Sequence, residues 1–124
     1  MGLQYAVPEG ISITGSEQHL YQVMDVLLDN ALKYSTPGSM VSVALHCTGH
    51  LCILSVASQG ESISKEDLKN IFKRFYRTDK VRTRNGSYGL GLSIAESIVQ
   101  AHKGKIWAES EQGQNTFYVQ LPVN

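Results

Sequence analysis

A carboxamide, an ammonium group and an aromatic ring lie within about one helical turn of each other. Asn30, Lys33 and Tyr34 are spaced by three and four residues, which in a helix places them along one edge. The carboxamide oxygen could ligate Mg²⁺, the ammonium could contact a phosphate, and the ring could border a base. The same residues could equally form a solvated helix edge with a lysine stem over apolar surface.

A glycine pair forms a second candidate, for anion binding. Gly89 and Gly91 stand at a predicted helix start, where free amide hydrogens and the helix dipole suit a phosphate. Glycine there can also serve only as a turn, and no GxxxxGK[ST] pattern follows, so this is not a P-loop. The preceding stretch, which could fold over the same phosphates, carries four basic side chains: Arg77, Lys80, Arg82 and Arg84.

Helices of recognisable pattern would position these residues. Between residues 16 and 35, apolar side chains recur every three or four positions, which predicts a helix with one buried face. A second amphipathic helix begins at the glycine pair and runs to about residue 103. Ser64 and Asp67 have the spacing of a capping box, which predicts a short helix toward Phe72.

Alternating apolar and polar residues predict strands. Residues 41–47 and 51–56 flank a turn at residues 48–50 and indicate an antiparallel hairpin. Residues 106–108 and 117–121 indicate a second pair. Hairpin rather than crossover connections favour an α+β fold, in which one layer of helices packs on one face of a mixed, largely antiparallel sheet.

Composition limits the classes of function. Eleven basic and eleven acidic side chains balance, so no net field favours nucleic acid or an anionic membrane. The 124 residues suffice for one domain with a core, and we predict a single domain over residues 1–124. There is no apolar run of membrane-spanning length and no secretory signal, so we expect a cytosolic chain. A strand-like stretch directly after Met1 suggests a fragment of something longer.

Cysteines and histidines receive structural interpretations. Cys47 and Cys52 fall in consecutive predicted strands with no metal-ligand spacing, and we predict reduced core thiols. His102 falls on the apolar face of the second helix and is predicted to be a hydrogen-bonded core residue.

In order and spacing, several segments resemble the histidine-kinase ATPase family, whose ATP site has the fold shared with gyrase, the Hsp90 chaperones and MutL. Residues 28–35 (LDNALKYS) resemble its asparagine box, residues 71–77 (IFKRFYR) its phenylalanine box and residues 88–95 (YGLGLSIA) its second glycine box. The likeness runs from about Leu3 to Leu121. It implies a two-layer α/β sandwich of the Bergerat type, with an ATP lid at about residues 77–88.

Carried over by position, the resemblance implies ATP and Mg²⁺ as cofactors. Asn30 would be the Mg²⁺ ligand, Lys33 a phosphate contact and Tyr34 a neighbour of the nucleotide. Ile63 and Leu92 would line the adenine slot. The other positions that it assigns to ATP or to the lid are Ser58, Gly60, Phe72, Phe75, Arg77, Arg82, Tyr88, Gly89, Leu90 and Gly91, with Arg77 and Arg82 near the terminal phosphate.

Three positions depart from the family pattern. Ser58 stands where the family usually has the aspartate that accepts a hydrogen bond from the adenine amino group. A hydroxyl can accept that bond, but being uncharged and shorter it would cost about 1 kcal/mol of affinity. Ser62 replaces the second glycine of the first glycine box, and Val26 replaces a further asparagine that many members have one turn before Asn30.

The resemblance also implies partners. The family donates the γ-phosphate of ATP to a histidine in a helical dimerisation domain, so that domain and, through it, a response regulator are expected, in the cytoplasmic part of a membrane-anchored bacterial sensor kinase. The fragment is expected to be monomeric, without direct contact to nucleic acid or membrane.

Other functions stay open. A degenerate, non-catalytic nucleotide-binding signalling module would account for Ser58 and Ser62, and an anti-sigma type serine kinase would use the same fold. A heat-shock or gyrase type ATPase is disfavoured, because no glutamate immediately precedes Asn30.

Overall fold

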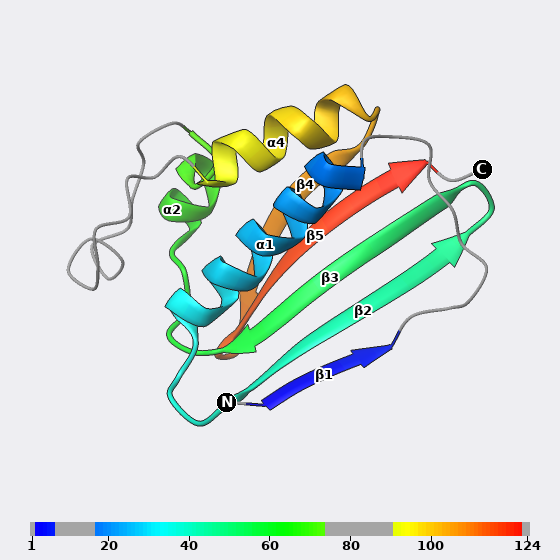
Figure 1. The fold of residues 1–124 in the computed structure, drawn as a ribbon. Helices are drawn as coiled ribbons and strands as arrows, with labels where there is room; N and C mark the ends of the chain where they lie inside the picture. Colours follow the sequence, from blue (N-terminus) through cyan, green and yellow to red (C-terminus); the bar gives the residue numbers. More distant parts are fainter. Residues whose placement is uncertain (1, 7–16, 74–90, 123–124) are drawn as a thin grey trace.

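One mixed sheet carries the helices on a single face. The computed structural model of the protein describes residues 2–6, 17–73 and 91–122. Within them five strands lie in the order β1-β2-β3-β5-β4, and α1 and α4 cross one face of the sheet (Figure 1). The first strand, β1 (Gly2–Ala6), pairs parallel with β2, and the other neighbours are antiparallel. The predicted α+β sandwich is confirmed.

Two tight hairpins build most of the sheet. In the first, β2 (Met40–Thr48) turns into β3 (Leu51–Gln59), and in the second, β4 (Lys105–Glu111) turns into β5 (Gln114–Pro122). The second turn has positive φ at both of its residues, 50° at Gln112 and 76° at Gly113. Two such residues match the twist of antiparallel strands. The hairpins join because β5 pairs with β3, so β5 lies between β3 and β4.

The three described helices differ in length and role. The longest, α1 (Glu17–Tyr34), and α4 (Gly91–Ala101) pack against each other and on the sheet, whereas α2 (Lys65–Asn70) is one short segment after β3. The Ser64 hydroxyl caps α2 by accepting a hydrogen bond from the Asp67 amide at 3.0 Å, as predicted. None of the described helices is long and apolar enough to cross a membrane.

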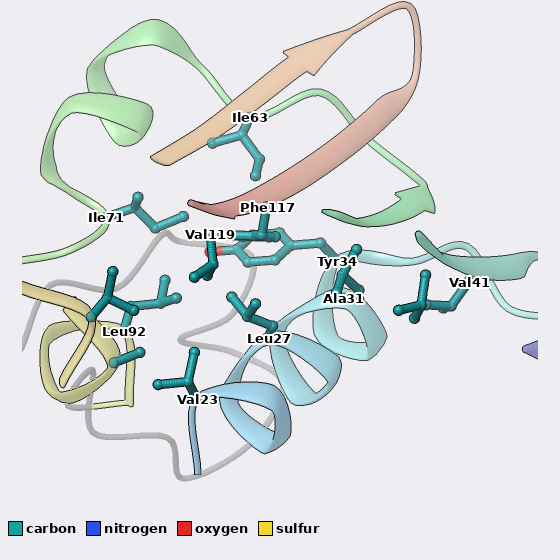
Figure 2. Packing of buried hydrophobic residues seen from close by; sticks show 14 of the residues in the cluster. Val23, Leu27, Ala31, Tyr34, Val41, Ile63, Ile71, Leu92, Phe117 and Val119 are labelled. Atoms are coloured by element: carbon teal, nitrogen blue, oxygen red, sulfur yellow. The ribbon is translucent and has the colours of Figure 1, made fainter. Parts of the chain in front are cut away.

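The core lies between the helices and the sheet. The apolar stripe of α1 supplies Val23, Leu27, Ala31 and Tyr34, all buried. These side chains converge on Phe117 and Val119 of β5 (Figure 2). Each fully buried aliphatic or aromatic side chain contributes about 1.5–3 kcal/mol relative to exposure. This contact therefore fixes α1 on the central strands.

The prediction of reduced cysteines is wrong. Cys47 and Cys52 are joined by a disulfide that links β2 to β3. The reason is the register of the hairpin, which places the two residues directly opposite each other with their Cα atoms 4.0 Å apart. The two-residue turn of this hairpin therefore sets the register that brings together two cysteines five positions apart in the sequence.

The prediction for His102 is confirmed in its hydrogen bond and corrected in its burial. The Nδ1 atom of His102 lies 2.8 Å from the carbonyl oxygen of Ile98, one helical turn earlier. The side chain is half-buried rather than part of the core, because it follows the last residue of α4. It therefore closes the helix end.

Replacing Phe117 tests the core. We expect Phe117→Ala to lower the free energy of unfolding by about 3–5 kcal/mol, because it leaves a large cavity under α1. Tyr118→Ala, on the opposite face of the same strand, removes a half-buried ring stacked on Trp107 at a centroid distance of 5.1 Å and should cost about 1–2 kcal/mol. Urea unfolding measures both. Equal costs would contradict a core on the helix side alone.

Candidate functional site

The exposed edge of α1 holds two of the three predicted side chains. Asn30 and Lys33 are partly buried beside the apolar stripe. The Tyr34 ring instead turns into the core, is 4% exposed and lies 6.4 Å from the Phe117 ring (Figure 2). Tyr34 follows Ala31 by three positions and Leu27 by seven, so it falls on the stripe itself. The expected arrangement of all three along one edge is wrong for Tyr34.

The Asn30 carboxamide is held in one orientation. Its Nδ2 donates a hydrogen bond of 2.9 Å to the carbonyl oxygen of Val26, one turn earlier. This bond uses the donor end of the amide and leaves the oxygen end as the group that could ligate a cation. Val26 also lies close to the start of α4, because a Cβ added at Gly91 would lie 3.5 Å from Val26 Cγ1. Asn30 therefore lies one helical turn after a residue that is close to the start of α4.

Lys33 is engaged in an ion pair on its own helix. Its Nζ lies 2.9 Å from Asp29 Oδ2, with the Lys33 side chain 17% exposed and that of Asp29 60% exposed. An ion pair of this spacing on a helix contributes only about 0.3–0.5 kcal/mol. An anion arriving near the end of α1 could therefore share or take over the ammonium at little cost.

Backbone contacts join the end of α1 to the end of β3. The Thr36 amide donates to the Gln59 carbonyl oxygen at 2.6 Å, and the Gly60 amide donates to the Gly113 carbonyl oxygen at 2.9 Å. A Cβ at Gly60 would overlap the Tyr34 carbonyl oxygen. Only glycine permits this approach. The loop after β3 and the helix edge with Asn30 and Lys33 therefore belong to one region.

Ser58 is buried, and its hydroxyl has no hydrogen-bond partner in the described part of the chain. It is 1% exposed, and its Oγ forms no hydrogen bond among the described residues. Burying a hydroxyl without a partner costs roughly 1–3 kcal/mol, so such groups usually have a reason. The Ser58 hydroxyl, near the end of β3, could thus accept a hydrogen bond from a ligand or donate one to it.

The other predicted positions divide between the core and the surface near it. Ile63 and Leu92 are buried members of the core cluster (Figure 2). Phe72 is partly buried and packs against that cluster. Gly91 is the first residue of α4, as expected from the predicted helix start. Five predicted residues, namely Arg77, Arg82, Tyr88, Gly89 and Leu90, lie outside the described residues, as do Lys80, Arg84 and Phe75.

Two polar residues were missed in the sequence analysis, the half-buried Ser110 and the buried Asn115. The Ser110 hydroxyl donates to Asn115 Oδ1 at 2.5 Å, and Asn115 is 0% exposed. The alternating pattern of the strand could have predicted the position of Asn115. Extending the alternation of Phe117, Val119 and Leu121 backward by two places Asn115 on the buried face.

Comparison with known proteins identifies the class. Residues 15–124 match the family described as histidine kinase-, DNA gyrase B-, and HSP90-like ATPase. Sensor histidine kinase WalK of Bacillus subtilis is 46% identical over 103 residues, which are 81% of this chain and 17% of WalK. Sensor histidine kinase TrcS of Mycobacterium tuberculosis is 40% identical over 93% of this chain and 24% of TrcS. The chain thus spans about a quarter or less of the length of these two relatives.

Solved structures agree. The mycobacterial sensor histidine kinase MprB has a TM-score of 0.89 at 26% identity, over 99% of this chain and 84% of that one. Full-length ShkA in complex with AMPPNP has a TM-score of 0.83 at 26% identity, over 98% of this chain and 25% of that one. The chain belongs to the histidine kinase-, DNA gyrase B-, and HSP90-like ATPase family. Within it, the relatives identify the catalytic ATP-binding domain of a sensor histidine kinase.

The contact under Tyr34 makes Gly60 a stability test. We expect Gly60→Ala to lower the free energy of unfolding by about 1–3 kcal/mol or more, because backbone atoms must shift to admit the methyl group. Gly91→Ala is the matched control, since its Cβ would meet nothing closer than 3.5 Å. We expect it to be neutral or slightly stabilising. Urea unfolding measures both variants. An unchanged free energy of unfolding in Gly60→Ala would contradict the close approach of Gly60 to the Tyr34 carbonyl oxygen.

Proposed function

We propose that this domain binds Mg²⁺-ATP and donates the γ-phosphate to a histidine on a separate helical dimerisation domain in two-component signal transduction. The observation that carries the proposal is the buried Ser58 hydroxyl, which has no hydrogen-bond partner among the described residues and lies in the region where the end of α1 meets the loop after β3. A buried polar atom of this kind suits a ligand that supplies the missing bond.

Ser58 would recognise the adenine base. Its hydroxyl oxygen can accept a hydrogen bond from an exocyclic amino group, and the apolar side chains of Ile63 and Leu92 belong to the nearby core. An apolar slot with one placed polar group is the usual form of a small-molecule site. The hydroxyl carries no charge, so we expect a weaker adenine contact than an aspartate would give.

The phosphates would lie toward α1 and the start of α4. Lys33 offers an ammonium group whose ion pair with the exposed Asp29 is weak, and amides at the first turn of α4, beginning at Gly91, favour anions. We propose Arg77 and Arg82 as lid contacts to the terminal phosphate, and Tyr88, Gly89 and Leu90 as further contacts to the nucleotide. Charge neutralisation and positioning provide most of the catalysis in phosphoryl transfer.

The donor set fits Mg²⁺. Asn30 presents a neutral carboxamide oxygen whose orientation is fixed by the bond from Nδ2 to Val26. Mg²⁺ accepts few protein ligands and keeps several waters, so a single carboxamide beside ATP phosphates is sufficient. Asn30 would hold the ion, whose chemistry when bound would be to neutralise phosphate charge.

The acceptor histidine and the response regulator would lie outside this chain. In its relatives this domain is a minor part of a longer sensor kinase, and a structure of ThkA in complex with the response regulator TrrA shares the fold, with a TM-score of 0.82. We propose that this chain serves as the cytoplasmic catalytic part of a membrane-anchored kinase and is monomeric by itself.

A second candidate is a degenerate nucleotide-binding signalling module. It is favoured by the same residue, because Ser58 lacks the carboxylate that usually recognises adenine. Ser62 and Glu61, in the adjoining loop, are exposed. The two candidates differ in whether ATP binds with a metal dependence that requires Asn30.

Calorimetric titration with AMPPNP, with and without Mg²⁺, tests the proposal. We expect binding in the micromolar to sub-millimolar range that Mg²⁺ strengthens, and loss of the Mg²⁺ effect in Asn30→Ala. Ser58→Asp should tighten binding about fivefold, because a carboxylate accepts the adenine hydrogen bond more strongly.

Ser55→Ala is the matched control, because Ser55 lies on β3 on the face away from the helices, and we expect unchanged affinity. Thermal unfolding checks that every variant is folded, which matters for Ser58→Asp because it places a carboxylate at a buried position. No measurable heat for the parent at millimolar nucleotide would exclude the kinase, whereas binding that neither Mg²⁺ nor Asn30 strengthens would favour the degenerate nucleotide-binding module.

A further inference from the structure

One row of the sheet departs from the apolar pattern on its helix-facing side. Three rows are formed by apolar residues and cysteines, and the third of them pairs Val56 with Phe117 and Phe117 with Ala108. The next row, at the end of β3, contains Ser58, Asn115 and Ser110 on the neighbouring strands β3, β5 and β4. Directly opposed residues of paired strands point to the same face. Three polar side chains therefore lie side by side under the helix layer.

Two members of this row bind the loop that follows β3. The Ile63 amide donates to Ser110 Oγ at 2.8 Å, and Asn115 Nδ2 donates to the Glu61 carbonyl oxygen at 2.9 Å. The hydrogen bond between Ser110 and Asn115 joins these contacts into one chain. The loop is thus attached to the sheet at two points, a carbonyl and an amide two residues apart.

Side chains, not a backbone ladder, set the path of this loop. Residues 60–64 belong to no helix or strand, so the strand pairing ends at Gln59. The side chains of Glu61 and Ser62 are exposed, and neither contributes an apolar group to the core. Ile63 is the buried anchor, and its amide is the one that Ser110 holds.

We infer that Ser110 and Asn115 are positioning residues for nucleotide binding, which hold residues 61–63 so that Ser58 and Ile63 keep the spacing that the base requires. The inference rests on the proposed function. Neither residue needs to touch the nucleotide, because each acts through the backbone of the loop. Ordering a segment in advance removes an entropic cost from binding.

The test combines two readouts on the same variants. Amide hydrogen exchange at Ile63, followed by NMR without nucleotide, reports the attachment of the loop, and calorimetry with AMPPNP and Mg²⁺ reports affinity. We expect Ser110→Ala to speed the exchange of Ile63 about tenfold or more and to raise Kd about fivefold. Ser110→Thr keeps the hydroxyl and should restore both values. Ser55→Ala should change neither.

A second variant guards against misfolding. Asn115→Ser replaces the carboxamide by a hydroxyl that cannot bond both Ser110 and Glu61. We therefore expect faster exchange at Ile63 and a higher Kd in this variant too. If exchange at Ile63 accelerates while Kd stays at the parent value, the attachment is structural only and the inference is overturned. Unchanged exchange overturns it as well.

The outcome for the parent separates this inference from the function on which it rests. A parent protein that binds no AMPPNP removes the proposed function, and the positioning role with it. Binding by the parent that is insensitive to Ser110→Ala removes the inference and leaves the function standing.

Discussion

The packing of α1 on the central strands β3 and β5 determines where the polar side chains of the site can lie. The stripe from Val23 to Tyr34 packs in one core cluster with Val56 and Phe117, which fixes both the position of the helix and its rotation about its own axis. Because the rotation is fixed, Asn30 and Lys33 must lie along the edge of the stripe. The C-terminal end of the helix then comes so close to β3 that only glycine fits at position 60.

The polar row at the end of the sheet is costly for folding and useful for binding. Apolar residues at Ser58, Asn115 and Ser110 would extend the core by one row, whereas buried polar groups add stability only when they are bonded. Asn115 and Ser110 are bonded, through each other and the loop backbone. Ser58 is not, among the described residues, which concentrates the unsatisfied polarity at one atom. Departures from an otherwise consistent core are expected at functional sites.

Local patterns were sufficient to predict most of the elements. The helix and hairpin periods gave the strands and helices to within a few residues, because period and turn chemistry act over short distances. The placement of β5 between β3 and β4 could not be derived, since pairing between distant strands leaves little trace in either strand alone. The prediction of reduced thiols at Cys47 and Cys52 was wrong because it relied on composition and did not consider the register between β2 and β3.

Side-chain environments were harder to predict than elements. Tyr34 was placed on an edge by its distance from Asn30, although its spacing from Leu27 and Ala31 puts it on the buried stripe. Asn115 and Ser110 were overlooked because they lie outside the strands predicted at residues 106–108 and 117–121, while the strands in fact extend to the turn residues themselves. The partners of a buried polar group depend on contacts between distant segments. Sequence spacing alone does not reveal such contacts.

The measurement that tests the account most directly is an NMR titration of the isotope-labelled protein with AMPPNP and Mg²⁺, followed at backbone amides. The account predicts that the largest shifts cluster at residues 30–35, 58–63 and 91–92, with little change at the hairpin turn at residues 48–51. Shifts concentrated at that turn, or none at saturating nucleotide, would contradict a nucleotide site at the polar end of the sheet.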